Sequence, residues 1–83
     1  MTNTTALSPS SSAFLSGDQA LAIAQADAVV AYKDLSPYRI HLVLNDDHWQ
    51  IDYELKDARR KGGGPHYTID AHHGTIIAKR YEQ

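Results

Sequence analysis

The sequence predicts one small α+β domain, with a single N-terminal helix packed on an antiparallel meander of three to four strands. Two observations favour this fold. An alanine-rich run over residues 20–32 carries a broad apolar arc at helical spacing. From Tyr38 onward, apolar and polar residues alternate, which is typical of strands that bury only one face. Short turn segments separate most of the alternating runs, so successive strands should pair as hairpins.

Length and composition set the limits of the domain. The chain has 83 residues, enough for one domain. Residues 1–16 are rich in Ser and Thr and poor in large apolar side chains, so we expect a disordered tail there and a single folded domain over residues 17–83. A domain of this size buries only about 60% of its unfolded surface, so a homodimer or another protein partner would help to stabilise it.

Charge and cysteine content exclude several classes of function. The net charge is −2 with His neutral, which gives no basic field for nucleic acid or an anionic membrane. The chain has no cysteine, so we expect no disulfide framework, thiolate nucleophile or zinc-thiolate centre. Neither a membrane-spanning run nor a secretory signal is evident. These features predict a cytoplasmic protein without a bound cofactor.

Clear start and stop signals bound the predicted helix. Ser16 and Gln19 have the spacing of a capping box, in which each side chain bonds the backbone of the other residue. The alanines of the following run are small enough to let a helix lie close to a sheet. Pro37 ends the helix, because the residue before a proline avoids helical dihedral angles.

Asp27 is the unusual residue of this helix, because it falls inside the apolar arc. We expect its carboxylate either to reach solvent at the edge of the arc or to bond a strand hydroxyl such as that of Tyr53 or Tyr67. The alternative is a buried polar anchor at a partner interface.

The alternating runs predict four strands and the side chains that each presents. The expected strands are residues 38–44, 48–55, 66–70 and 75–81. In the second run, Trp49, Ile51 and Tyr53 should face the helix, with Trp49 and Tyr53 foremost in the core. Gly74 should supply a positive φ in the last hairpin. In the last run Ile76 and Ile77 are adjacent, so the alternation leaves open which of them is buried.

The outward-facing residues are the candidates for function. Five histidines are many for this length, and three of them could share the exposed sheet face with Asp52 and Asp70. A metal site there would use His41, His48 and His66, but their spacing matches no metal-binding motif, and histidines are common on exposed sheets. A carboxylate pair drawn from Asp52, Glu54 and Asp70 would lack the concave pocket that acid–base catalysis needs.

These residues therefore favour a non-enzymatic binding surface. The segment Lys56–Gly64 carries three basic residues directly before three glycines, without the pattern of a phosphate-binding loop. It is either a solubilising hairpin loop or a basic contact loop for an acidic partner. The predicted partner-binding residues are Arg59, Arg60, Lys61, His41, His48, Asp52, Glu54 and His66.

Three segments of the sequence resemble known families. They are GDQALAIAQ from Gly17, WQIDYEL from Trp49, and GGGPHYTIDAHHGTIIAKRY from Gly62. Together they resemble PepSY-like domains, and also the short bacterial immunity proteins of the nuclear-transport-factor-2-like group. The second likeness depends mainly on turn and core residues, which are Gly63, Gly64, Pro65, Tyr67, Ile69, Asp70, Gly74 and Ile76. The chain is too short for the full nuclear-transport-factor-2 cone, so the helix-plus-meander prediction stands.

The resemblance implies one principal function and one alternative. As an immunity protein, the chain would bind a cognate bacterial toxin and neutralise it, most simply by blocking its active site. As a PepSY-type module, it would restrain a peptidase. A small metal-binding domain built on the three histidines is the third hypothesis.

Overall fold

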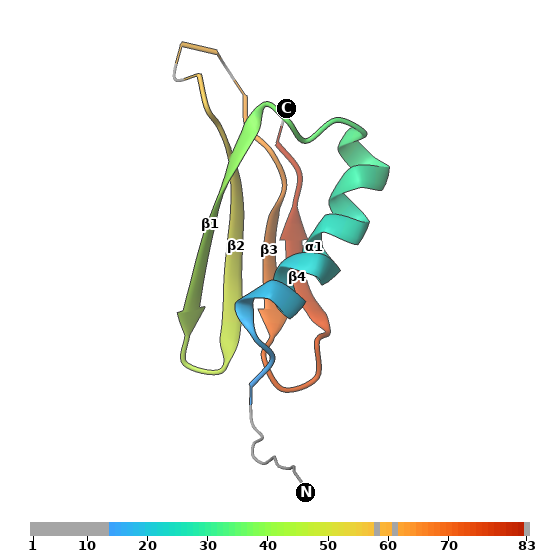
Figure 1. Ribbon diagram of the computed structural model, residues 1–83, viewed down its shortest axis with the longest axis vertical. Helices are drawn as coiled ribbons and strands as arrows, with labels where there is room; N and C mark the ends of the chain where they lie inside the picture. The colour runs from blue at the N-terminus through green and yellow to red at the C-terminus, as the bar shows by residue number, and fades with distance from the viewer. Residues whose placement is uncertain (1–13, 58, 61, 83) are drawn as a thin grey trace, which may run out of the picture.

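The computed structural model describes residues 14–57, 59–60 and 62–82 and shows one helix followed by four strands (Figure 1). Helix α1 spans Gly17–Tyr32. The strands are β1 (Tyr38–Asn45), β2 (His48–Leu55), β3 (His66–Asp70) and β4 (Ile76–Arg80). This arrangement confirms the predicted α+β fold with a four-stranded sheet. Within the described part of the chain, no helix has the length and apolarity to cross a membrane.

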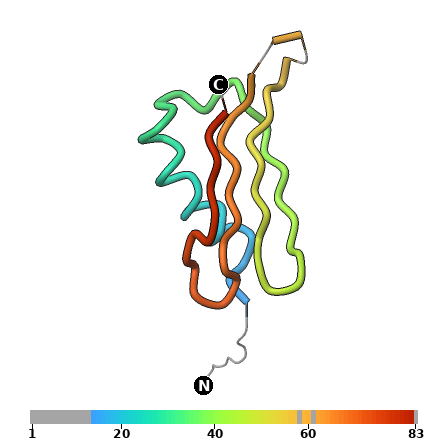
Figure 2. Tube along the Cα trace, turned by 180° about the vertical axis from the view of Figure 1, so that it is seen from behind, coloured from blue at the N-terminus to red at the C-terminus, as the bar shows by residue number. Residues whose placement is uncertain are grey.

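The four strands form one antiparallel sheet in chain order, β1-β2-β3-β4. The β1–β2 turn places Asp46 at a φ of 55°, and the β3–β4 turn places Gly74 at a φ of 74° as predicted. Helix α1 crosses one face of this sheet obliquely, and in the view from behind none of the described helices or strands covers the other face (Figures 1 and 2). We call this second side the helix-free face.

Helix α1 begins and packs as its sequence predicts. Ser16 is the N-cap, and Ser16 and Gln19 form the complete capping box. The fully buried residues of the helix are Ala20, Ala24 and Ala28. Their spacing of four places them on one line along the helix, where the small side chains allow close contact with the sheet.

The core lies between this alanine line and the two central strands. Ile51 and Tyr53 of β2 and Tyr67 and Ile69 of β3 are each at most 1% exposed. Trp49, predicted to be foremost in the core, is only partly buried at its margin. The helix therefore covers the middle of the sheet more completely than its edges.

Both edge strands depart from simple alternation. In β1, Ile40 and Leu44 point to the helix side but remain 40% and 38% exposed. In β4, Ile76 pairs with Ile69 and packs on the core. Ile77 is the extra residue of a β-bulge and is 59% exposed. The bulge therefore turns Ile76 rather than Ile77 toward the core, which the alternation of apolar residues alone could not predict.

The chain contacts the sheet before the predicted domain boundary at Gly17. The Leu15 amide donates to the Ala71 carbonyl at 2.6 Å, and the Leu15 carbonyl accepts from Trp49 Nε1 at 3.0 Å. The Phe14 ring packs edge-on against His72. The indole N–H of a partly buried Trp needs an acceptor, and the Leu15 carbonyl supplies it. Phe14 and Leu15 therefore pack against the folded domain, although the sequence predicts a tail there. The rest of the predicted tail, residues 1–13, lies outside the described residues.

Candidate functional site

The helix-free face brings together side chains from the three strands β2, β3 and β4. Because side chains alternate along a strand, the polar positions of β2 and β3 all point to this side. Strand register then places His66 opposite Asp52 and Thr68 opposite Gln50. Directly opposed residues of neighbouring strands are close enough for side-chain contact.

A hydrogen-bonded network connects these opposed pairs. His66 Nδ1 lies 2.7 Å from Asp52 Oδ1, and Gln50 Nε2 donates to the same oxygen at 3.0 Å. The Thr68 hydroxyl donates to Gln50 Oε1 at 2.9 Å. Since a carboxylate can only accept, the imidazole must carry a proton on Nδ1. Each member therefore fixes the orientation of the next.

The far side of the His66 ring meets a second carboxylate. His66 Nε2 is buried and lies 3.3 Å from Glu82 Oε2, without the geometry of a hydrogen bond. Glu82 in turn accepts from the Arg80 guanidinium at 3.0 Å. The His66 side chain is only 18% exposed although no helix in the described part of the chain covers it. A carboxylate thus lies on each side of the His66 ring.

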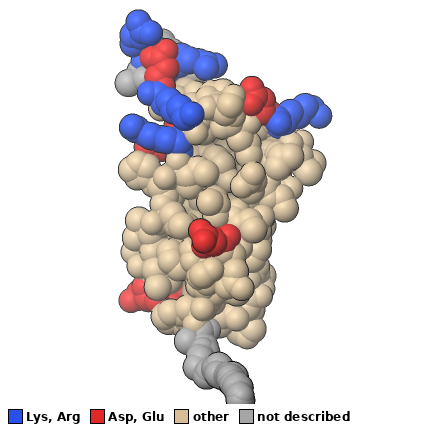
Figure 3. Space-filling model, in the orientation of Figure 1, with Lys and Arg blue, Asp and Glu red and all other residues tan. Residues whose placement is uncertain are grey.

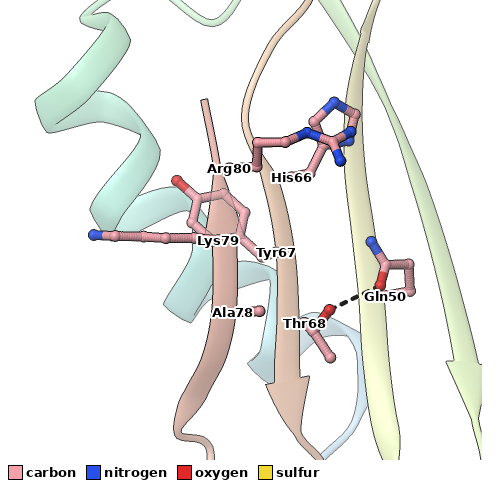
Figure 4. A pocket seen from close by; sticks show the side chains of 7 residues that line it. All are labelled: Gln50, His66, Tyr67, Thr68, Ala78, Lys79 and Arg80. Atoms are coloured by element: carbon pink, nitrogen blue, oxygen red, sulfur yellow. Dashed lines mark hydrogen bonds between the residues drawn. The ribbon is translucent and has the colours of Figure 1, made fainter. Parts of the chain in front are cut away.

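A hollow opens beside this network. It measures about 240 Å³ and lies over Ala78, whose small side chain leaves space between Thr68 and Arg80 (Figure 4). The complete lining is Gln50, His66, Tyr67, Thr68, Ala78, Lys79 and Arg80. Two of these side chains, those of Tyr67 and Lys79, extend toward helix α1 (Figure 4). The hollow itself belongs to the helix-free face.

The other predicted site residues form separate groups. Glu54 Oε1 lies 3.3 Å from His41 Nε2 and 3.8 Å from Arg39 Nε, on the β1 side of the face. His48 pairs with Asp47 at 3.7 Å, near the β1–β2 turn. The structure thus brings Asp52 together with His66, and His41 with Glu54, but leaves His48 apart.

The predicted basic loop lies at one end of the molecule. The segment between β2 and β3 extends beyond the sheet, and Lys and Arg side chains gather at that end (Figures 1 and 3). The side chain of Arg59 is 92% exposed and pairs with Asp57 at 3.2 Å, and Arg60 is also exposed. Lys61 lies outside the described residues. The loop is therefore a separate contact region rather than part of the network.

The metal hypothesis requires three ligands to converge. Among the described residues, no group of three or more His, Asp or Glu side chains is arranged to hold an ion. His41, His48 and His66 instead each pair with a different carboxylate. The described residues therefore do not bring these three histidines together as the metal hypothesis requires.

A second polar cluster lies on the helix side of the sheet, around Asp27. Its carboxylate accepts from the hydroxyls of Tyr81 at 2.6 Å and Tyr67 at 2.8 Å, and from Lys79 Nζ at 3.0 Å. The Tyr81 bond is the main cause of a lowered Asp27 pKa, and burial opposes it. Burial and the bond to Asp27 raise the pKa of Tyr67. The predicted bond from Asp27 to a strand hydroxyl is confirmed for Tyr67.

Sequence reasoning missed four residues of the helix-free network. Strand alternation puts Gln50 and Thr68 on the helix-free face but does not show that they link Asp52 to its neighbours. Arg80 comes opposite His66 only because of the β4 bulge, and Glu82 follows the end of that strand. Gln50 lies between His48 and Asp52 on the same face of β2, and this position is the one feature of the sequence that indicates the network.

Comparison of the chain with protein-family models, with curated proteins and with solved structures found no match.

Proposed function

We propose that this chain is a non-enzymatic binding protein of the bacterial cytoplasm that neutralises a cognate toxin through its helix-free face. The observation that supports this proposal is the hydrogen-bonded network on Asp52, whose side chains are half-buried although the one helix of the described residues lies on the other face. A surface ordered before binding loses little conformational entropy when a partner arrives. Such a surface suits recognition of a folded macromolecule.

The size and openness of the hollow support a protein partner over a small molecule. Small-molecule sites are enclosed clefts of about 300–1,000 Å³. The hollow beside the network is about 240 Å³ and lies on the outer face of the sheet. It can accept one side chain of a partner, while the surrounding strands supply a flat contact area.

The network also gives little support to catalysis. An Asp–His pair can activate a nucleophile only when a hydroxyl or thiol meets the free ring nitrogen. Here His66 Nε2 faces the Glu82 carboxylate at 3.3 Å instead. Thr68, the nearby hydroxyl of the hollow, donates to Gln50. The arrangement presents fixed charges and hydrogen-bonding groups for recognition.

The charged loop supports an electrostatic contribution to the same function. Arg59 and Arg60 are exposed at the end of the sheet, where they can meet an acidic surface without rearrangement of the fold. Charges at the margin of an interface mainly accelerate association and select the partner. That the partner is a bacterial toxin is what the sequence resemblance implies.

The test uses co-expression with the product of the adjacent reading frame. We expect growth arrest by that product alone, normal growth when this chain is co-expressed, and a stable complex between the two purified proteins. Continued poisoning in the presence of the folded chain would reject the toxin assignment. Reduced activity of an adjacent peptidase would instead support a PepSY-type regulatory role.

A pair of arginine substitutions tests which surface binds. Ala78→Arg fills the hollow without removing a member of the network, and we expect affinity to fall about 30-fold or more, as at an interface hot spot. Val30→Arg is the matched control, because Val30 is 76% exposed on the helix. Equal affinity of both variants would show that the helix-free face is not the contact surface.

A further inference from the structure

The two edges of the sheet are protected to very different degrees. Strand β4 has five residues, carries the Ile77 bulge and ends in Lys79 and Arg80. Lys79 also ties this edge to Asp27 of the helix. Bulges, short strands and lysines are the devices by which proteins keep sheet edges from pairing with other chains. The β4 edge is therefore closed to a further strand.

Strand β1 is less protected, because Arg39 near its start is its only lysine or arginine. It has eight residues in continuous register with β2, without proline or lysine. Apolar side chains are exposed on both of its faces, with Ile40 and Leu44 on the helix side and Val43, 50% exposed, on the helix-free face. An edge of this kind is a template for strand addition.

The hydrogen-bond pattern identifies which backbone groups point outward from β1. The Lys56 amide donates to the Pro37 carbonyl at 2.9 Å, so these two residues form a hydrogen-bonded pair. The next pair along the strands, Tyr38 and Leu55, is therefore of the non-hydrogen-bonded type. Hydrogen-bonded and non-hydrogen-bonded pairs alternate along antiparallel strands, so every second residue directs its N–H and C=O away from β2. Within the strand those residues are Tyr38, whose N–H donates to the Leu35 carbonyl, and Ile40, Leu42 and Leu44.

We propose that β1 pairs antiparallel with β1 of a second copy of this chain, with Leu42 opposite Leu42 of that copy. This register places outward-pointing backbone groups directly opposite one another, as a hydrogen-bonded ladder requires. It also places Ile40 opposite Leu44 of the second copy. The apolar row on the helix side thus continues from one copy into the other.

The charges on the helix-free face fit the same register. His41 comes opposite Val43 of the second copy, and Arg39 comes opposite Asn45, so no like charges meet. Centring the pair on His41 instead would set one histidine against the other. The sequence around Leu42 is therefore complementary to itself, which a two-fold dimer needs and an unrelated strand would not supply.

The dimer would extend the candidate binding surface. Opposed residues of an antiparallel pair lie on the same face, so both helices would cover one side of an eight-stranded sheet. The two helix-free faces would then form one continuous surface with His41 and Val43 of both copies near the axis. This inference does not depend on the toxin proposal, since it concerns only the β1 edge of the sheet.

The first test measures the mass of the full chain by sedimentation equilibrium. We expect a dimer, and we expect Val43→Lys to raise its dissociation constant about tenfold or more, because each lysine would face His41 of the other copy. Ile77→Lys is the matched control at the β4 edge, where the replaced side chain is 59% exposed. That control should leave the dissociation constant unchanged.

The second test reads the register directly. The chain has no cysteine, so His41→Cys and Val43→Cys introduce unique thiols. Mixing the two variants under mild oxidation should give a cross-linked dimer, because non-hydrogen-bonded opposed pairs bring Cβ atoms within disulfide range. An Arg39→Cys and Val43→Cys mixture, which is out of register, should cross-link far less.

Three results would overturn the proposal. The first is a wild-type chain that stays monomeric up to about 1 mM. The second is a dimer that Val43→Lys and Ile77→Lys weaken equally, which would place the contact elsewhere. The third is a monomer whose Val43→Lys variant loses binding to the adjacent gene product, which would assign the β1 edge to that partner. A dimer that passes both tests stands even if the adjacent product proves not to be a toxin.

Discussion

Asp27 and Asp52 lie on opposite faces of the same sheet, and each carboxylate accepts hydrogen bonds from several neighbours. The donors to Asp27 come from β3, β4 and the end of the chain, so this cluster ties helix α1 to the sheet. The donors to Asp52 all lie within the sheet surface. A hydrogen-bonded carboxylate thus holds the helix to the sheet on one face and orders surface side chains on the other.

The packing around the two clusters differs in the same way. On the helix face, three alanines and four large side chains are almost completely buried. On the helix-free face, the hollow over Ala78 remains open to solvent. Hydrogen bonds without apolar burial contribute only modestly to folding, because folding exchanges bonds to water for bonds within the protein. This difference makes the helix-free face the better candidate for function.

Substituting one alanine on each face should give the largest contrast. Ala24 is 0% exposed beneath the helix, so Ala24→Leu must force the helix from the sheet. We expect a loss of about 2–3 kcal/mol in the free energy of unfolding. Ala78→Leu on the helix-free face should change it by less than about 0.5 kcal/mol. Urea titrations of both variants measure the difference, and similar losses would show that the two faces are equally packed.

Neutralising the two carboxylates should give a smaller contrast. Asp27→Asn removes the ion pair with Lys79 and weakens the bond from buried Tyr67, and we expect a cost of about 1–2 kcal/mol. Asp52→Asn should cost less than about 1 kcal/mol, because the amide oxygen can still accept from Gln50 and His66. Thermal melts at neutral pH provide the measurement.

Partner binding should show the opposite order for the same pair of variants. Asp52→Asn disturbs the ordered surface, so it should weaken binding to the adjacent gene product, whereas Asp27→Asn should leave binding unchanged. If Asp52→Asn lowered stability more than Asp27→Asn, or if Asp27→Asn weakened binding more than Asp52→Asn, the roles assigned to the two clusters would be wrong.

The sequence predicts the helix face far better than the helix-free site. The capping box of Ser16 and Gln19 and the Asp27–Tyr67 bond depend on local spacing and on one helix–sheet contact. The hollow depends instead on the β4 bulge, which aligns Arg80 with His66 after one extra residue. The alternation of apolar and polar residues cannot show that a bulge falls at Ile77. It therefore does not predict which residues of β3 and β4 pair beyond that point.

Two further features were beyond sequence reasoning for a similar physical cause. Glu82 lies past the last strand, where no periodic pattern constrains the chain. Leu15 falls in a Ser-rich segment, but its backbone satisfies the Trp49 indole and the Ala71 carbonyl. Backbone partners of this kind leave no signature in side-chain composition.

The smallest expected effect is the acid dependence of the contrast between the two clusters. The hydroxyls of Tyr81 and Tyr67 and the charge of Lys79 hold the Asp27 pKa below its ordinary 3.8. Above pH 3.8 the carboxylate is charged in both the folded and the unfolded chain, so its stabilising contribution is complete. As the pH falls further, the unfolded chain takes up the proton first and the contribution is lost. Stability should therefore decrease on acidification.

Melting temperatures of the wild type and Asp27→Asn, compared over a pH series, isolate this contribution. We expect the difference between them to be largest near neutrality and to shrink below pH 3.8. Both proteins should also lose stability on acidification because of Asp70, whose pKa is lowered mainly by the hydrogen bond from the His72 amide. This loss is common to the two and cancels in the difference. Asp57→Asn, in the exposed loop, should give almost no difference at any pH. A difference for Asp27→Asn that stayed constant on acidification would mean that its charge does not hold the helix to the sheet.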